Sequence, residues 1–187
     1  MTSRTLRADA ARNRQALLAA ARVRFAHTGE GTGMDDVAAA AGVGVGTLYR
    51  HFPTKTDLLH ALYAERLAEF AEQDERCVTD PPWARLAAMV SAMIEAQSTD
   101  LALADAPTCD AVATSPELAQ VRTVFHLALE RLIAAAIASG DLRPGVTPGD
   151  IVTLCFNRHL VKNPSGWQTY ASIVLAGLRA PASKESG

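Results

Sequence analysis

The sequence lacks the features that mark several classes of protein. Its three cysteines are odd in number, widely spaced and without a CxxC pair, which disfavours both a disulfide framework and a structural zinc site. No run of about 18 uninterrupted apolar residues occurs, so we expect no membrane span. Residues 1–14 carry four arginines and no apolar stretch, so we expect no secretory signal. These absences favour a soluble cytoplasmic protein without a metal ion or other cofactor.

Aromatic residues are also scarce, at 5%, whereas apolar residues make up 49% of the chain and charged residues 20%. A chain of this composition can bury a normal core, and its richness in alanine favours helices over a sheet. Apolar residues recur at helical spacing, and Thr-x-x-Asp capping patterns begin at Thr32, Thr54 and Thr147. The sequence therefore predicts an all-α protein of about nine helices, at residues 8–28, 35–41, 45–52, 56–77, 83–98, 101–113, 117–139, 148–159 and 165–179.

The net charge of −2 conceals an asymmetry along the chain. Residues 1–60 hold eight lysines and arginines against five acidic residues, whereas the remainder holds ten against fifteen. Because residues 1–60 are basic and the rest of the chain is acidic, we expect the N-terminal part to bind a polyanion.

The most informative stretch is residues 34–55, MDDVAAAAGVGVGTLYRHFPTK. It predicts two short helices joined by a tight turn at Gly42, which is close to a helix-turn-helix. Leu48 and Phe52 are expected to point into the core, and the rest of the second helix is expected to face solvent. Its hydroxyls, basic groups and apolar methyls suit phosphates and base edges in a major groove. For Lys55, contact with a phosphate and plain solvation are both compatible with the sequence.

Over residues 12–60 the sequence resembles the tetracycline-repressor (TetR) family, most specifically at Gly42-Val43, at Gly46 through Phe52 and at Lys55. The resemblance implies a two-lobed, all-helical homodimer with a helix-turn-helix DNA-binding domain at 1–54 and an effector-binding and dimerisation domain at 55–187. It implies a transcriptional regulator, most simply a repressor that leaves a palindromic operator when a small, largely apolar effector binds. The DNA contacts that it implies are Thr32, Val45, Gly46, Thr47, Tyr49, Arg50, His51 and Lys55.

Two positions depart from the family pattern. Gly44 and Val45 stand where the family more often has a serine and a basic residue, so its base preference does not transfer to this chain. Val45 can instead contact a thymine methyl group.

In the C-terminal part the resemblance is looser, and it implies that the last two helices pair with their copies. Their surplus of apolar residues is consistent with a dimer interface. The candidate dimer residues are Ile151, Leu154, Cys155, Trp167, Tyr170, Val174 and Leu178. A pocket needs polar groups among apolar neighbours, although a salt-bridged core would look the same. The candidate effector contacts are Trp83, Met89, Met93, Gln97, Cys109, Arg122, Phe125 and His126.

Two other classes of function are compatible with parts of the sequence. A helical adaptor could bind RNA or a protein through its basic N-terminus, but it would not need the glycine turn and the exposed face that follows it. An enzyme is the least favoured alternative, because no nucleophile elbow, zinc-protease or phosphate-loop motif occurs. Cys155 and His159 could share a helical face, yet no third ligand or orienting carboxylate accompanies them. We therefore expect no catalytic residues.

Overall fold

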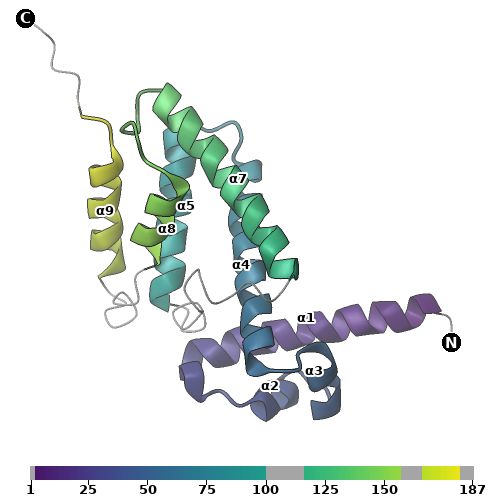
Figure 1. The fold of residues 1–187 in the computed structure, drawn as a ribbon. Coiled ribbons are helices and arrows are strands. Elements are labelled where there is room, and N and C mark those ends of the chain that lie inside the picture. The colour runs from purple at the N-terminus through teal and green to yellow at the C-terminus, as the bar shows by residue number, and fades with distance from the viewer. Residues whose placement is uncertain (1–2, 100–115, 157–165, 182–187) are drawn as a thin grey trace, which may run out of the picture. The chain divides into compact units, whose positions relative to one another are not determined.

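The computed structural model describes residues 3–99, 116–156 and 166–181. These residues form eight α-helices and one 3-10 helix, and Figure 1 shows their order along the chain. The elements are α1 (Ser3–Thr28), η1 (Gly29–Gly31), α2 (Met34–Ala40), α3 (Val45–His51), α4 (Lys55–Arg76), α5 (Pro82–Thr99), α7 (Pro116–Ala138), α8 (Pro148–Cys155) and α9 (Trp167–Leu178). The predicted all-α fold is confirmed. The helix predicted at 101–113 lies outside the described residues.

The chain divides into two compact units. Unit 1 comprises Met1–Arg66 with Asp100–Ala119, and unit 2 comprises Leu67–Thr99 with Gln120–Gly187. Helices α4 and α7 each contribute residues to both units. The boundary predicted between residues 54 and 55 falls inside unit 1, at the start of α4, and as a functional division it stays a prediction.

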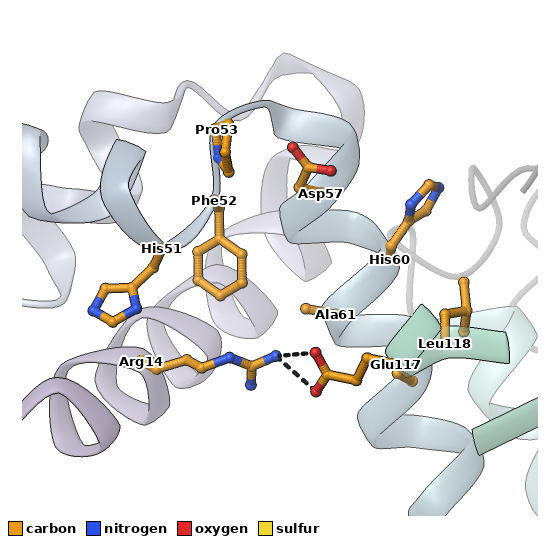
Figure 2. A pocket seen from close by; sticks show the side chains of 10 residues that line it. Arg14, His51, Phe52, Pro53, Asp57, His60, Ala61, Glu117 and Leu118 are labelled. Atoms are coloured by element: carbon orange, nitrogen blue, oxygen red, sulfur yellow. Dashed lines mark hydrogen bonds and ion pairs between the residues drawn. The ribbon is translucent and has the colours of Figure 1, made fainter. Parts of the chain in front are cut away.

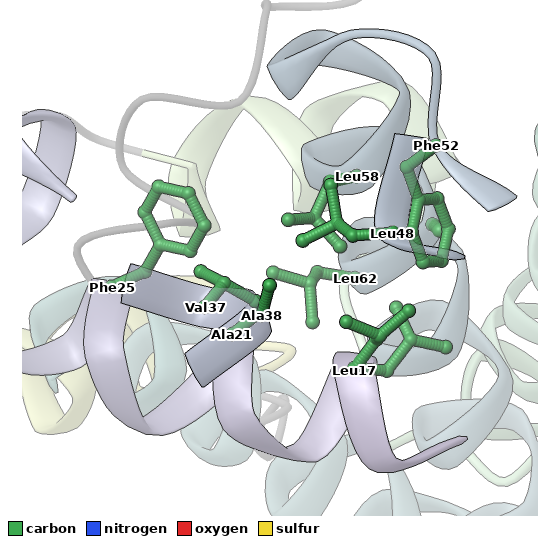
Figure 3. Close-up of a cluster of buried hydrophobic side chains, with 11 residues drawn as sticks. Leu17, Ala21, Phe25, Val37, Ala38, Leu48, Phe52, Leu58 and Leu62 are labelled. Carbon is green, nitrogen blue, oxygen red and sulfur yellow. The ribbon is translucent and has the colours of Figure 1, made fainter. Parts of the chain in front are cut away.

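Unit 1 is built around one apolar cluster, in which α1 packs on α2 and α3 and the first turns of α4 close the core (Figure 3). Small side chains at the crossing, Ala21 and Ala38, let α1 and α2 approach closely, and Leu17, Leu48 and Leu58 fill the centre. Helices α2 and α3 have seven residues each, which is too short for stability in isolation, so this packing is what keeps them folded.

The turns of unit 1 follow from local sequence, with one exception. Gly42 ends α2 with φ +67°, a conformation that a residue with a Cβ rarely adopts. Thr54 and Asp57 form the predicted capping box: Thr54 N–H donates to Asp57 at 2.9 Å, and Asp57 N–H donates to the Thr54 hydroxyl at 3.1 Å.

The exception is Thr32, whose predicted capping role is wrong. Helix α2 has Gly33 at its N-cap position and no side-chain cap. The Thr32 side chain is buried, and its hydroxyl bonds to the Thr28 hydroxyl and the Arg24 carbonyl of α1 instead. Contact with α1 therefore takes the place of the local cap.

In unit 2, α5 packs against both α8 and α9, and the Phe70 and Phe125 rings join α4 to α7 with centroids 6.2 Å apart. Thr147 and Asp150 form a second capping box at α8, as predicted. Hydrogen bonds from Thr147 hold the pKa of the Asp150 carboxyl below its ordinary value. Helix α8 ends at Cys155, earlier than the predicted end at residue 159, and α9 starts at Trp167 with Gly166 as its N-cap residue.

Candidate DNA-binding surface

Helix α3 is held from one side. Leu48 is fully buried and Phe52, which caps the end of the helix, is 3% exposed. Both side chains pack in the unit 1 core (Figure 3). Because they lie about one helical turn apart, this packing fixes the orientation of the opposite face of α3.

The opposite face carries the predicted contact residues. Tyr49 is 46% exposed and Val45 40% exposed, and both are large side chains that unit 1 leaves in solvent. Gly46 and Arg50 are also exposed, whereas Thr47 and His51 are partly buried. The structure thus brings six of the predicted residues onto one short helix, with an apolar methyl pair, an aromatic hydroxyl and a guanidinium available for a DNA groove.

The other two predicted DNA contacts, Lys55 and Thr32, lie outside α3. Lys55 lies in the first turn of α4, partly buried, with its amine 5.4 Å from the centroid of the Phe25 ring. Thr32 has a buried side chain, and its backbone N–H donates to the Gly29 carbonyl. Both of its donors are used inside unit 1, and its contact with DNA stays a prediction.

The candidate effector residues differ in how deeply they are buried. Met89, Met93, Gln97 and Phe125 are buried, Trp83 and Arg122 are partly buried, and Cys109 lies outside the described residues. His126 is exposed, and its place in an effector pocket stays a prediction. Gln97 is 2% exposed, and its side-chain carbonyl has no hydrogen-bond partner among the described residues. It is the most notable polar group of the set, because leaving a buried acceptor unpaired is costly.

Trp83 has a structural role within unit 2. The guanidinium of Arg179 lies 4.4 Å from the centroid of its ring and also pairs with Asp141 at 3.0 Å. These contacts tie the end of α9 to the start of α5 and to the turn after α7.

The candidate dimer residues are mostly internal. Ile151, Cys155, Val174 and Leu178 are buried within unit 2, where their side chains pack its core, and their part in a dimer interface stays a prediction. Leu154, Trp167 and Tyr170 are partly buried, and the Tyr170 hydroxyl donates to the Leu154 carbonyl at 2.7 Å. Ile173, another apolar residue of α9, is 64% exposed.

Unit 1 also contains a cavity of about 210 Å³ that the sequence did not predict (Figure 2). It is lined from α1, α3, α4 and the first turn of α7, and His51 and Phe52 form part of its wall. Arg14 pairs with Glu117 at one side, across 103 positions of sequence. No local pattern connects such distant residues, so sequence reasoning had no signal for this cavity.

Two structural features bear on metal binding and membrane insertion. Within the described ranges, no three His, Cys, Asp or Glu side chains gather as they would around a metal ion. Across the same residues, no helix combines the length and apolarity needed to cross a membrane.

The fold and the exposed α3 define a helix-turn-helix protein, and comparison with known proteins identifies its family. Residues 17–62 match the model of the bacterial regulatory proteins of the tetR family, and residues 81–180 match the C-terminal domain of SbtR-like transcriptional regulators. The HTH-type transcriptional repressor LfrR of Mycolicibacterium smegmatis is 31% identical over 153 residues, covering 80% of this chain and 77% of LfrR.

Solved structures of TetR regulators are also similar to this chain. A TetR transcription regulatory protein from Mycobacterium vanbaalenii is similar with a TM-score of 0.66 and 32% identity, covering 94% of this chain and 99% of that one. The TetR regulator SCO0520 from Streptomyces coelicolor has a TM-score of 0.61 and 28% identity, covering 90% and 99%. The chain belongs to the TetR family of bacterial transcriptional regulators. It is a transcription factor and not an enzyme.

Proposed function

We propose that this regulator binds a palindromic operator as a homodimer in the cytoplasm, and that it represses transcription until a small, largely apolar effector releases it. The observation that carries the proposal is the exposed face of α3, fixed by Leu48 and Phe52 behind it. Two copies in a closed dimer would present two such helices to half-sites about 34–36 Å apart.

The side chains of this surface make two kinds of contact with DNA. Val45 and Tyr49 contact base edges or thymine methyl groups, and Thr47, Arg50 and His51 contact phosphates or bases. Gly46 lets the DNA backbone approach the helix. Lys55 contributes its charge at the start of α4, where its amine also lies over Phe25.

For the effector, we propose a site in unit 2 that includes Gln97. Its unpartnered carbonyl among Met93 and other buried apolar side chains is the kind of polar group that orients a mostly apolar ligand. An effector releases DNA only to the extent that it prefers the unbound arrangement of the two α3 helices, and about 1–3 kcal/mol of coupling is typical.

The test of the DNA-binding surface is the Tyr49→Ala variant, measured against an operator selected from genomic fragments with the purified protein. Because the ring is 46% exposed, its loss leaves the core intact, and we expect an unfolding midpoint close to that of the wild type. Operator affinity should fall about tenfold or more, as for a lost base contact.

A matched control uses two exposed valines. Val45→Ala, on α3, should also weaken operator binding, whereas Val124→Ala, at a 52% exposed position of α7, should leave it unchanged. Equal operator affinity for Tyr49→Ala, Val45→Ala and the wild type would overturn the assignment of this face. Selection of fragments without a palindrome would count against a dimeric operator complex.

A further inference from the structure

Helix α1 is longer than the core of unit 1 requires. It begins at Ser3, yet the first of its residues in the core cluster is Leu17, and none of residues 8–16 is buried. The helix contacts the end of α3 at Arg14, whose guanidinium lies 5.5 Å from the centroid of the Phe52 ring. Figure 1 shows α1 continuing past α3 toward its N-terminus. Residues 3–13 therefore form an arm of about 16 Å that starts beside the C-terminal end of α3.

This arm is helical because of its residue types and not because of packing. Its sequence, SRTLRADAARN, is rich in alanine and arginine, which are both strong helix formers. It carries three arginines, Arg4, Arg7 and Arg12, against one carboxylate, that of Asp9. The arm thus extends an excess of positive charge beyond the core of unit 1, which suits an anionic partner.

The arm has few of the apolar side chains that other partners need. Leu6 is the only large apolar residue among residues 3–13. A helix that lies on a membrane needs a broad apolar face, and a protein interface needs buried aromatic or aliphatic anchors. A nucleic acid needs neither, because its phosphates are bound through charge. Duplex DNA is the nucleic acid that the position of the arm favours, because the arm belongs to the same helix that packs on α3.

Arg12 is the arginine of the arm that is best placed to bind a phosphate. Its side chain is 72% exposed, and it pairs with Asp9, which is 38% exposed. Exposed ion pairs contribute little to stability, so Arg12 can exchange this carboxylate for a phosphate. Arg14, one residue beyond the arm, is only 28% exposed and pairs with Glu117. The charge available to DNA therefore lies within the arm and not at Arg14.

We propose that this basic arm contacts phosphates of the DNA next to the bases that α3 contacts. Arg12 lies nearest to α3 along the helix, and Arg7 and Arg4 lie further along it. Phosphate contacts carry no sequence information, so they add affinity for any duplex and make that affinity more dependent on salt. The arm rests on the proposed DNA-binding surface of α3, but the two are separable. Loss of a base contact weakens binding to the operator alone, whereas loss of a phosphate contact weakens binding to every duplex.

The test measures the affinity of the full-length chain for the selected operator and for an unrelated duplex over a series of salt concentrations. Arg12→Gln should reduce the slope of log affinity against log salt by about 0.9 on both duplexes, as for one lost phosphate contact. The double variant Arg4→Gln/Arg7→Gln should reduce it by up to about 1.8. Because Arg12 is exposed and glutamine favours helices, Arg12→Gln should keep the unfolding midpoint of the wild type.

Arg76→Gln is the matched control. Arg76 is 69% exposed and pairs with Glu72 within α4, much as Arg12 pairs with Asp9 within α1. Arg76 lies outside the arm, near the end of α4, so its loss should leave the salt slope unchanged. Tyr49→Ala provides the contrast with α3, since it should weaken binding to the operator more than binding to the unrelated duplex.

Asp9→Asn gives a second, opposite test. It removes the negative charge of the arm and releases Arg12, so it should tighten binding to both duplexes by up to about fivefold. Arg12→Gln and Asp9→Asn break the same ion pair, so a purely structural role would make them change DNA affinity in the same direction. That result, or salt slopes equal to that of the wild type in Arg12→Gln and in Arg4→Gln/Arg7→Gln, would overturn the proposal. Binding of the arm to phosphatidylserine vesicles with unchanged DNA slopes would assign it to a lipid surface instead.

Discussion

At the scale of a single residue, Cys155 lies buried in α8 with its sulfur 3.9 Å from the Val90 carbonyl of α5. Desolvation raises the pKa of this thiol to about 12. A thiolate is therefore scarce at neutral pH, and Cys155 serves as a small apolar side chain rather than a nucleophile or metal ligand.

The raised pKa predicts a loss of stability at alkaline pH. In the unfolded chain the thiol ionises near 9.0, whereas in the folded protein it keeps its proton until about 12. The folded state thus binds more protons between these values, and the free energy of unfolding falls there by up to about 1.4 kcal/mol per pH unit. Denaturant unfolding between pH 8 and 10.5 should show this slope for the wild type relative to Cys155→Val. Parallel curves would contradict the prediction.

At the scale of the element, local sequence predicts some helix starts and not others, for a physical reason. Thr54 and Thr147 cap their helices as predicted, because each is exposed and bonds to its own aspartate. Thr32 carries the same signature, but its hydroxyl finds partners on α1 and it turns away from α2. A capping pattern predicts the start of an element, and tertiary packing decides which side chain satisfies it.

The capping box of α4 supports a direct test. Thr54→Ala removes the hydroxyl that accepts from Asp57 N–H, and it should lower the free energy of unfolding by about 1 kcal/mol. Thr56→Ala, in the same first turn but outside the capping box, is the matched control and should change it by less than about 0.5 kcal/mol. Equal effects of the two variants in denaturant unfolding would refute the capping role.

At the scale of the whole molecule, the sequence predicted the all-α class, the helix-turn-helix and the family, and these are confirmed. It did not predict which apolar residues remain exposed. Ile151, Val174 and Ile173 share one apolar pattern, yet only Ile173 lies in solvent. The distinction depends on how α8 and α9 turn against α5, which periodicity alone does not specify. The sequence also did not predict the Arg14–Glu117 ion pair, because this pair joins segments 103 positions apart.

Ile173 provides the test of the dimer. We propose that the exposed face of α9 with Ile173 lies in the dimer interface. A charge at this position would be desolvated there, so Ile173→Glu should produce monomers in sedimentation analysis. Val78→Glu is the matched control, since Val78 is 65% exposed against 64% for Ile173, and it should remain dimeric. Operator affinity should fall with dissociation in the first variant only. A dimeric Ile173→Glu protein would remove this face from the interface.

The passage of α4 and α7 through both units has a practical consequence for protein engineering. A chimera that takes only residues 1–66 from this chain would keep Arg14 and leave Glu117 behind. A graft that preserves this ion pair must carry the start of α7 as well, as a second piece of polypeptide.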